Sequence, residues 1–448
     1  YLRLRSPRVC GPPPHHRETI AMKLAEFKKA GHWPTLLAAF LYFDISFMAW
    51  VALGPLIVYI ARDMNLAVNE KFTLVAIPVL AGALLRVPMG ILADVIGAKR
   101  TGIIAQLVVI SATASVWHFG LTSKLAIELF GLALGVGGAS FAVALPQASR
   151  WYPPQYQGVV MGIAGAGNSG TVLAALFAPG LAALSGWQNV FGWALIPLLA
   201  TLVIFALVAK NAPERPKPKA FGDYLKALGD RDSWWFMFFY SVTFGGFIGL
   251  ASALPGYFSD QYGLNPVTAG YYTAACVCAG SLLRPLGGAL ADRIGGIRTL
   301  LMMYSIASLC ITVVGFNLPS ATAALAFFVA AMLGLGAGNG AVFQLVPQRF
   351  RREIGVMTGL IGMAGGIGGF CLTAGLGAIK QSTGDYQLGL WLFASLGVLA
   401  PLPALIGHWQ ATVLLQQLLQ PSAAAALWQL DAHHWQLKKF PLPAAVTT

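Results

Sequence analysis

The stretch AGALLRVPMGILADVIGAKRT (81–101) decides the fold, because AGSLLRPLGGALADRIGGIRT (279–299) repeats it at an offset of 198 residues, 279 minus 81. Each copy holds one arginine inside an apolar helix, Arg86 in the first and Arg284 in the second. A charged side chain at the centre of a membrane-spanning helix costs roughly 2.5–3.5 kcal/mol on insertion scales. Two such charges at equivalent places indicate one anion site at the interface between two related halves of the chain.

The composition indicates a polytopic membrane protein. The 448 residues are 57% hydrophobic and 10% charged, whereas soluble domains contain about 25% charged residues. A net charge of +13 suggests nucleic acid as a partner of a soluble protein, but here Lys and Arg gather in loops on one side, as membrane topology requires. We therefore exclude nucleic acid and expect the lipid bilayer as the surroundings. The five cysteines and seven histidines suggest neither a metal site nor a cofactor, and the spans hold no nucleophile–base pair of an enzyme.

The apolar runs predict an all-α membrane protein with twelve transmembrane helices in two pseudo-symmetric halves. Six runs near the criterion of about 20 residues fall in residues 35–210, and six fall in 233–411. The runs lie near 35–61, 72–93, 101–119, 125–148, 158–183, 189–210, 233–258, 266–291, 299–316, 321–346, 355–379 and 388–411. A polar, Pro- and Lys-rich linker (211–232) joins the halves. Two such halves, with a site between them at the midplane, are typical of a transporter that rocks one half against the other.

Lys and Arg placement puts both termini and the linker in the cytoplasm, with the chain in the cell membrane. The N-terminal cytoplasmic segment covers 1–34, and we expect translation to start at Met22, leaving 1–21 untranslated. A transit peptide is the alternative for this basic stretch, which is poor in acidic residues. The C-terminal tail (412–448) has two short apolar stretches broken by proline, so we expect disorder or a surface helix.

Each arginine helix ends in the motif G-x-L-A-D-x-x-G-x-K/R. The residues at its key positions are Gly90, Asp94, Gly97 and Arg100 in the first copy, and Gly288, Asp292, Gly295 and Arg298 in the second. Glycine permits a tight turn and close helix approach, and we expect the acidic and basic residues to pair and to hold one conformation, as a gate. The alternative is an ordinary pair of basic loops. The motif resembles the loop signature of the major facilitator superfamily, and its occurrence in both halves strengthens that resemblance.

Two interpretations are open for the arginine pair. Each side chain could extend to the nearby headgroups with its charge in water. Alternatively, the two guanidinium groups face each other across the interface and clamp an anion. At a separation of about 8 Å their repulsion is roughly 2 kcal/mol at an effective dielectric constant near 20. A small anion relieves that repulsion and accepts forked hydrogen bonds, which lysine does not provide.

Two Gly-rich segments, GIAGAGNSG (162–170) and GMAGGIGGF (362–370), lie at matching places in the halves. No strand precedes them, so they are not phosphate-binding loops. In a membrane, small residues at this spacing let helices touch. The amide of Asn168 has two interpretations, since it can donate to a substrate oxygen or bridge two helices.

These segments, together with ASFAVALPQASRWYPP (139–154) and WWFMFFYSVTFGGFIG (234–249), resemble the nitrate/nitrite porter family of the major facilitator superfamily. The resemblance covers about residues 30–410. It implies a carrier of nitrate, with nitrite as a further substrate, that works by alternating access. We expect this carrier to be a monomer. It also implies that Arg86 and Arg284 hold the anion, and that the other binding residues are Asn168 and the aromatic residues Phe141, Tyr240 and Phe244.

Asp44, in FLYFDISFMAW (40–50), is a further charge within a span. A carboxylate there is expensive unless it is paired or protonated, so it is either a structural partner of an arginine or helix end, or a proton carrier. Two arginines and one nitrate leave one positive charge, which an ionised Asp44 would neutralise. The sequence therefore favours nitrate/proton symport for uptake. The alternatives are nitrate/nitrite exchange, transport of another small anion such as formate, or a nitrate sensor that does not transport.

Overall fold

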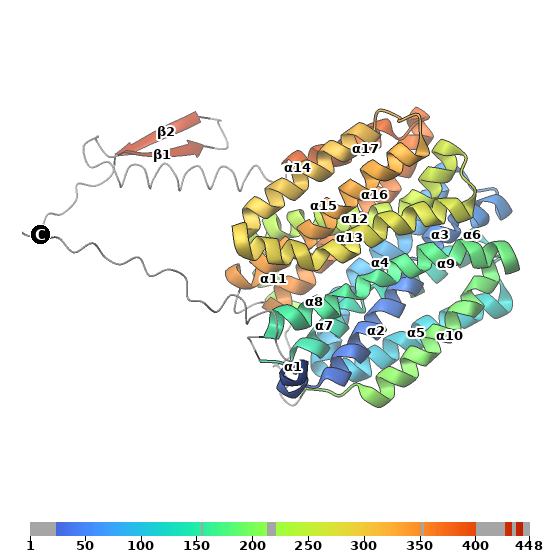
Figure 1. Ribbon diagram of the computed structural model, residues 1–448, viewed down its shortest axis with the longest axis horizontal. Coiled ribbons are helices and arrows are strands. Elements are labelled where there is room, and N and C mark those ends of the chain that lie inside the picture. The colour runs from blue at the N-terminus through green and yellow to red at the C-terminus, as the bar shows by residue number, and fades with distance from the viewer. Residues whose placement is uncertain are drawn as a thin grey trace, which may run out of the picture.

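The computed structural model describes residues 24–153, 156–212, 221–350 and 354–399, together with 426–431 and 436–441. Within the first four of these ranges every regular element is helical (Figure 1). Eleven of the described helical segments are long and apolar enough to cross a membrane, and Gln387–Leu399 is a shorter apolar helix. Their ends fall within about one helical turn of those predicted. The second part of the predicted twelfth span (400–411) and residues 1–23 lie outside the described residues.

The N-terminal half follows a short helix, α1 (Leu24–Ala30). Three of its six spans are divided into shorter helices, while the other three are continuous. The elements are α2 (Trp33–Trp50) with α3 (Leu53–Asp63), α4 (Val68–Val95), α5 (Ala98–Phe119), α6 (Lys124–Gly138) with α7 (Phe141–Ser149), α8 (Gln157–Gly165) with η3 (Ala166–Ser169) and α9 (Gly170–Ser185), and α10 (Trp187–Val208). The break at η3 falls in the Gly-rich segment, where glycine lowers the stability of a helix.

The C-terminal half has continuous helices at the matching places. A short linker helix, α11 (Phe221–Ala227), precedes it. Its elements are α12 (Arg231–Tyr262), α13 (Pro266–Ile294), α14 (Gly296–Val314), α15 (Ala321–Arg349), α16 (Ile354–Thr383) and α17 (Gln387–Leu399). The turn between α4 and α5 has the same backbone conformation as the turn between α13 and α14, since Gly97 and Gly295 have φ angles of +94° and +95°. Glycine adopts this conformation without the strain that other residues meet.

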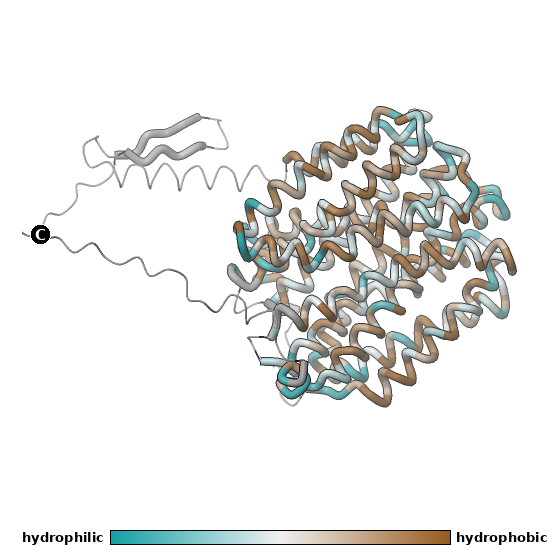
Figure 2. The backbone as a smooth tube through the Cα atoms, viewed as in Figure 1, coloured by the Kyte–Doolittle hydropathy of each residue, from teal (hydrophilic) through white to brown (hydrophobic). Residues whose placement is uncertain are grey.

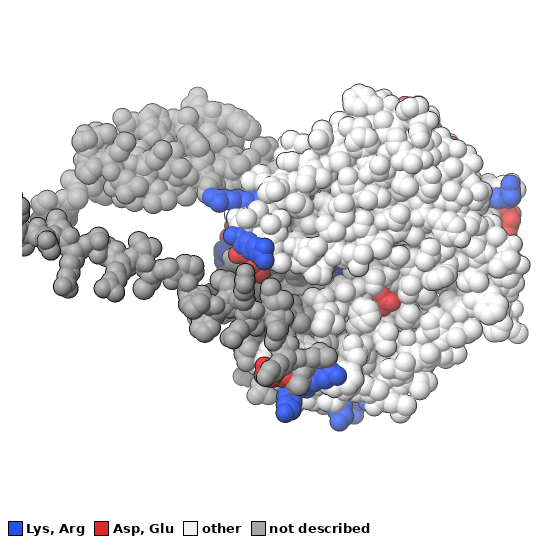
Figure 3. Space-filling model, viewed as in Figure 1, with Lys and Arg blue, Asp and Glu red and all other residues white. Residues whose placement is uncertain are grey.

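The surface of the helical body matches a lipid environment. Apolar residues cover the length of the outer helices (Figure 2), and most charged side chains on the visible face gather at its two ends, with one acidic side chain near the middle (Figure 3). Large exposed apolar side chains include Phe119, Leu184 and Leu207. The protein is therefore a multi-pass membrane protein. We call the end with the α4–α5 and α13–α14 turns the motif end, and the other the opposite end.

Small residues bring the two halves into contact. α4 packs along α16, and α9 packs along α13. A methyl group added at Gly366 of α16 would lie 2.5 Å from the Cβ atom of Ala83 on α4. One added at Gly270 of α13 would lie 2.7 Å from the carbonyl oxygen of Ala175 on α9. These contacts leave no room for larger residues, so they set how closely the halves approach.

The tail differs from its prediction where it is described. Ala426–Asp431 (β1) pairs antiparallel with Gln436–Pro441 (β2), with Leu430 opposite Leu437 and Leu427 opposite Phe440. The prediction of disorder or of a surface helix is therefore wrong for these residues. The alternation of apolar and polar residues in ALWQLD is typical of a strand. This pattern covers only six residues, so it gives a much weaker signal than the membrane spans.

A buried ion pair joins the halves at the opposite end. The Lys71 ammonium on α4 contacts Asp260 Oδ2 at the end of α12, and the Tyr386 hydroxyl donates to the same oxygen at 2.9 Å. The Lys71 side chain is 8% exposed and that of Asp260 is 25% exposed. Removing one partner from a buried pair leaves an uncompensated charge, which is strongly destabilising. The pair therefore favours the conformation in which this end is closed.

We predict that Asp260→Asn separates the halves at the opposite end. Spin labels at Asn69 and Ser382, placed in a background without the native cysteines, measure the separation by double electron–electron resonance. We expect a longer-distance population to increase because Lys71 loses its counter-charge. Glu70→Gln is the matched control, since it removes only the exposed Lys124–Glu70 pair (2.8 Å) within one half. An unchanged distance distribution in Asp260→Asn contradicts the prediction.

Candidate functional site

Arg86 lies on α4 at the interface between the halves. Its side chain is 1% exposed. The Nη1 atom donates to the carbonyl oxygen of Gly362, which lies on α16 of the other half. The Nε and Nη2 atoms have no hydrogen-bond partner among the described residues. Snorkelling to the headgroups is therefore not the conformation that this arginine adopts, and part of its fork is free to bind a ligand.

Arg284 lies on α13 and is 9% exposed, with an Nη1 atom that has no described partner. Its guanidinium and that of Arg86 both lie within 6 Å of the Phe141 ring, so the two charges are close enough to repel each other. Among the described residues, no carboxylate lies within the 4.0 Å ion-pair distance of either guanidinium. Two buried positive charges thus face one region without a counter-charge from the protein, which makes that region suited to an anion.

Aromatic rings link the two arginines. The centroid of Phe141 lies 5.3 Å from Arg86 Cζ and 5.8 Å from Arg284 Cζ, so this ring contacts both guanidinium groups. Phe244 lies 4.9 Å from Arg86 Cζ. Tyr240 stacks on Phe244 with centroids 5.1 Å apart and planes 3° apart. The structure therefore brings together five of the proposed binding residues from four helices, α4, α7, α12 and α13.

Two further rings at the site were missed from the sequence. Phe343 on α15 lies 5.7 Å from Arg284 Cζ and meets Tyr240 edge-on at 5.0 Å. Trp50, at the end of α2, lies 6.0 Å from Arg86 Cζ, and its indole N–H donates to the Pro78 carbonyl at 2.6 Å. The repeat offered a signal for Phe343, because LGLGAGNGAVFQLVPQ (333–348) resembles the segment that contains Phe141. No feature of the sequence indicated that Trp50 belongs to the site.

Asn168 on η3 and Asp44 on α2 lie close to each other in the chain's fold, and no contact between the described residues joins either of them directly to the two arginines. Asn168 is fully buried, and neither of its amide atoms has a described partner. The adjacent Ser169 hydroxyl donates to Asp44 Oδ1 at 2.6 Å. Phe43, the residue before Asp44, packs against Gly167 of η3, and its ring lies 5.7 Å from that of Phe141. Asp44 is therefore not an ion-pair partner of either arginine within the described chain, although it is 7% exposed.

The glycines of α16 make room for the aromatic rings. A methyl group added at Gly365 would lie 2.5 Å from Tyr240 Cδ1 and 3.0 Å from Phe244 Cδ1. One at Gly362 would lie 3.3 Å from Arg86 Cδ. The second Gly-rich segment is thus a packing surface that lets α4 and α12 approach α16.

At the motif end, the acidic residues have partners other than those expected. Asp94 pairs with Arg150 at the end of α7, at 2.6 Å, while Arg100 is exposed. In the second half, Asp292 accepts from the Gln344 amide at 2.9 Å. The expected pairing of each Asp with a basic residue of its own motif is therefore not what the structure has. The turns direct Arg100 and Arg298 away from the bundle.

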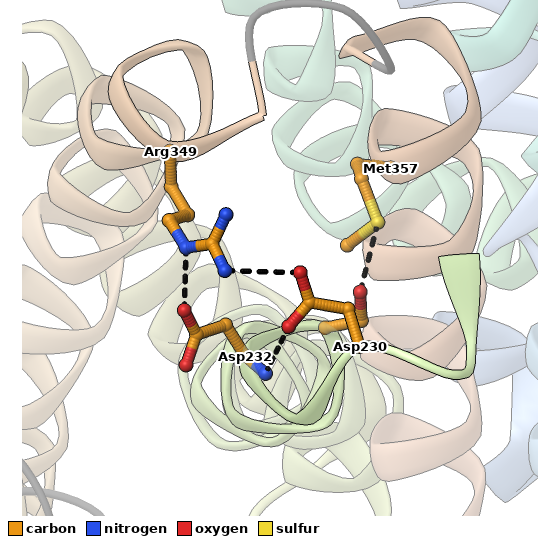
Figure 4. A network of polar contacts seen from close by, with 5 residues as sticks. Asp230, Asp232, Arg349 and Met357 are labelled. Carbon is orange, nitrogen blue, oxygen red and sulfur yellow. Dashed lines mark hydrogen bonds and ion pairs between the residues drawn. The ribbon is translucent and has the colours of Figure 1, made fainter. Parts of the chain in front are cut away.

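A second cluster at this end binds α15 to the start of α12. Arg349 donates from Nε to Asp232 at 2.5 Å and from Nη2 to Asp230 at 3.0 Å (Figure 4). The linker helix α11 lies nearby, with Tyr224 beside Gly90 of one half and Gly359 of the other. Burial raises the pKa of Tyr224, and the carboxylates of Asp94 and Asp223 raise it further. The linker is thus packed between the halves at the motif end.

A family model described as Major Facilitator Superfamily matches residues 37–373. The chain belongs to this superfamily. It is 32% identical over 368 residues to the nitrite extrusion protein of Bacillus subtilis (strain 168), covering 82% of this chain and 92% of that protein. It is 34% identical over 361 residues to the probable nitrate/nitrite transporter NarK2 of Mycobacterium tuberculosis (strain CDC 1551 / Oshkosh), covering 80% and 91%. It is 30% identical over 361 residues to the probable nitrate transporter NarT of Staphylococcus haemolyticus (strain JCSC1435), covering 80% and 92%.

These relatives show that the chain is a member of the nitrate/nitrite transporter family within the superfamily. A solved structure supports the fold. The crystal structure of a bacterial homologue of the human lysosomal transporter Spinster superposes with a TM-score of 0.64 at 20% identity, covering 82% of this chain and 94% of that chain. The predicted all-α fold of the superfamily is thereby confirmed.

We predict that Gly365→Ala lowers the melting temperature of the purified protein by several degrees. The added methyl group meets the Tyr240 ring, and overpacking of this kind costs about 1–3 kcal/mol. Gly375→Ala on the same helix is the matched control, because nothing lies within 4 Å of a methyl group there. That control is expected to leave the melting temperature unchanged or to raise it slightly. Equal melting temperatures of the two variants would show that α16 has room beside Tyr240.

Proposed function

We propose that this protein carries nitrate, and also nitrite, across the cytoplasmic membrane by alternating access. Three relatives that match most of the chain have names that refer to nitrate, to nitrite or to both. We place both termini in the cytoplasm, and we propose that a monomer is sufficient for transport.

One observation carries the choice of substrate. Two buried guanidinium groups from different halves present unpaired N–H groups to the same region, with no carboxylate within ion-pair distance among the described residues. Planar forks bind planar oxyanions with paired hydrogen bonds. The surrounding rings of Phe141, Tyr240 and Phe244 suit a flat, weakly hydrated anion. Chloride is spherical and gains less from this geometry.

The position of the arginines supports alternating access. Arg86 belongs to one half and Arg284 to the other, so the anion would bridge two bodies that move against each other. The Lys71–Asp260 pair closes the opposite end of this interface. An anion that neutralises the arginines lowers the repulsion between the halves, and this makes their closure around it more favourable.

Proton symport is our proposal for the coupling, with Asp44 as the proton carrier. Its hydrogen-bond partner among the described side chains is the neutral Ser169 hydroxyl, so no described cation is paired with it. Nitrate between two arginines leaves one positive charge in a buried region. In symport, Asp44 is protonated while nitrate crosses, and it releases its proton together with the anion on the cytoplasmic side. The ionised carboxylate then offsets one arginine in the empty carrier, so the buried region holds one net positive charge in both states.

Flux into proteoliposomes tests the proposal. Purified protein is reconstituted, and nitrate uptake is followed with either an inward proton gradient or internal nitrite. Uptake driven by the proton gradient supports symport, and uptake that needs internal nitrite supports exchange instead. Binding without uptake under either condition identifies a sensor. Formate that competes as strongly as nitrate at equal concentration contradicts nitrate as the substrate.

Arg86→Lys is expected to reduce nitrate uptake to near the background of empty liposomes. Lysine keeps the charge but has no planar fork, and it cannot both bind the Gly362 carbonyl and present two parallel donors. The measurement is initial uptake rate, with protein amount and melting temperature determined for each variant. Arg62→Lys is the control, because Arg62 is an exposed arginine at the end of α3. Near-normal uptake by Arg86→Lys would rule out the clamp.

Asp44→Asn is expected to abolish nitrate accumulation driven by a proton gradient while nitrate binding remains. The amide has nearly the same shape as the carboxyl group but does not release a proton. Binding affinity and gradient-driven uptake are measured on the same preparation. Glu128→Gln, at the start of α6, is the control, since that residue lies near a helix end. Undiminished accumulation in Asp44→Asn assigns this residue a structural role.

A further inference from the structure

Asn339 is a buried asparagine that the proposed mechanism does not use. It lies on α15 and is 0% exposed, and neither of its amide atoms has a hydrogen-bond partner among the described residues. A buried amide left without hydrogen-bond partners is unfavourable, because it has lost its hydrogen bonds to water and gained none in return. Such a residue is expected to serve a ligand or a neighbouring charge.

The neighbours of Asn339 place it at the depth of Arg284. The next residue, Gly340, packs directly against the carbonyl oxygen of Arg284 and the main-chain nitrogen of Gly288. Phe343 lies one turn further along the same face of α15, and its ring is 5.7 Å from Arg284 Cζ. Asn339 therefore lies on the part of α15 that packs on Arg284, one residue before the main-chain contact and one turn before the ring that contacts the guanidinium.

The repeat shows what stands at the equivalent place in the other half. Gly137 and Gly338 pack against the matching first helices of their halves, at the Ser46 carbonyl (2.8 Å) and the Thr243 side chain (2.7 Å). This alignment, which also pairs Pro146 with Pro347 in the sequence, makes Gly138 the counterpart of Asn339.

The two halves fill this place with different chemistry. In the N-terminal half, the indole of Trp50 covers Gly138 and Gly82 and lies 6.0 Å from Arg86 Cζ. In the C-terminal half, the smaller ring of Phe247 covers Gly280, the repeat partner of Gly82. An amide thus takes the place beside Arg284 where an indole lies beside Arg86. The site is polar on one side and aromatic on the other.

The functional meaning of this asymmetry follows from a comparison of the unpaired arginine donors with the oxygen atoms of nitrate and of nitrite. Arg86 Nη1 is already bonded to the Gly362 carbonyl, which leaves Nε and Nη2 of Arg86 and Nη1 of Arg284 as described unpaired donors. Nitrate has three oxygens in a plane and nitrite has two. Once the arginines bind two oxygens, the third oxygen of nitrate needs a donor from another direction. An asparagine N–H is a suitable donor, and its carbonyl can accept from Arg284.

We propose that Asn339 is a specificity-determining residue that donates a hydrogen bond to the third oxygen of nitrate and so favours nitrate over nitrite. This inference rests on the proposed nitrate transport, and it adds a residue to the site. A site built to bond a polar group discriminates strongly against an analogue that lacks the group, because a buried donor is then left unpaired.

The test compares the dissociation constants of nitrate and nitrite for wild-type protein and for Asn339→Leu, which has a similar volume without the amide. We expect the nitrate constant to rise about tenfold or more, as for a lost hydrogen bond to a charged group, while the nitrite constant changes by less than about threefold. Asn339→Ala repeats the measurement with a smaller side chain that cannot clash. Melting temperature and size-exclusion profile show that each variant is folded.

The control is Gln106→Leu, which removes another buried amide that donates to the Leu198 carbonyl (2.9 Å) between α5 and α10. Its ratio of nitrate to nitrite constants is expected to equal that of wild type. Equal weakening of both anions in the Asn339 variants, or no change in either, overturns the inference and leaves the proposed function intact. Wild-type protein that binds neither anion overturns the proposed function, and the inference with it.

Discussion

The repulsion between two buried guanidinium groups is the constraint on which the rest of the site depends. Arg86 and Arg284 come from different halves, contact the same Phe141 ring, and have no carboxylate within ion-pair distance in the described chain. Such an arrangement is unfavourable without an anion. Main-chain and aromatic contacts hold it in place: the Gly362 carbonyl binds one guanidinium, and rings cover both. A protein that only needed stability would have paired these charges.

Much of the architecture could be predicted from the sequence, because membrane spans leave a strong signal and the chain repeats itself. The repeat located both arginines, and the resemblance located Phe141, Tyr240 and Phe244, which the structure places together. Contacts between distant helices left no such signal. The bond from Arg86 to Gly362 joins residues 276 positions apart through a main-chain atom, which no residue type identifies. The Asp94–Arg150 pair was missed because a motif shows which residues recur and gives no information on what they contact.

The halves share a fold but differ in detail, and the differences concentrate at the site. Three spans of the N-terminal half are divided, whereas their counterparts α12, α15 and α16 are continuous. The division at η3 places the buried Asn168 in a short 3-10 helix, whereas the glycine-rich part of α16 stays α-helical. Both patterns follow from similar sequences, so tertiary packing decides between them. The anion that we propose to bind between the two halves does not share their symmetry, and this favours unequal sides.

The glycine contacts between α13 and α15 have a consequence for motion. Gly280 lies against Gly336, Arg284 against Gly340, and Gly287 against Ala337, all through main-chain atoms. These two helices therefore move as one body, and Arg284 moves with them. Arg86 belongs to the other body, so under the proposed alternating access any rocking of the halves changes the distance between the two like charges. Their repulsion then disfavours closure of the empty carrier more than closure around a bound anion.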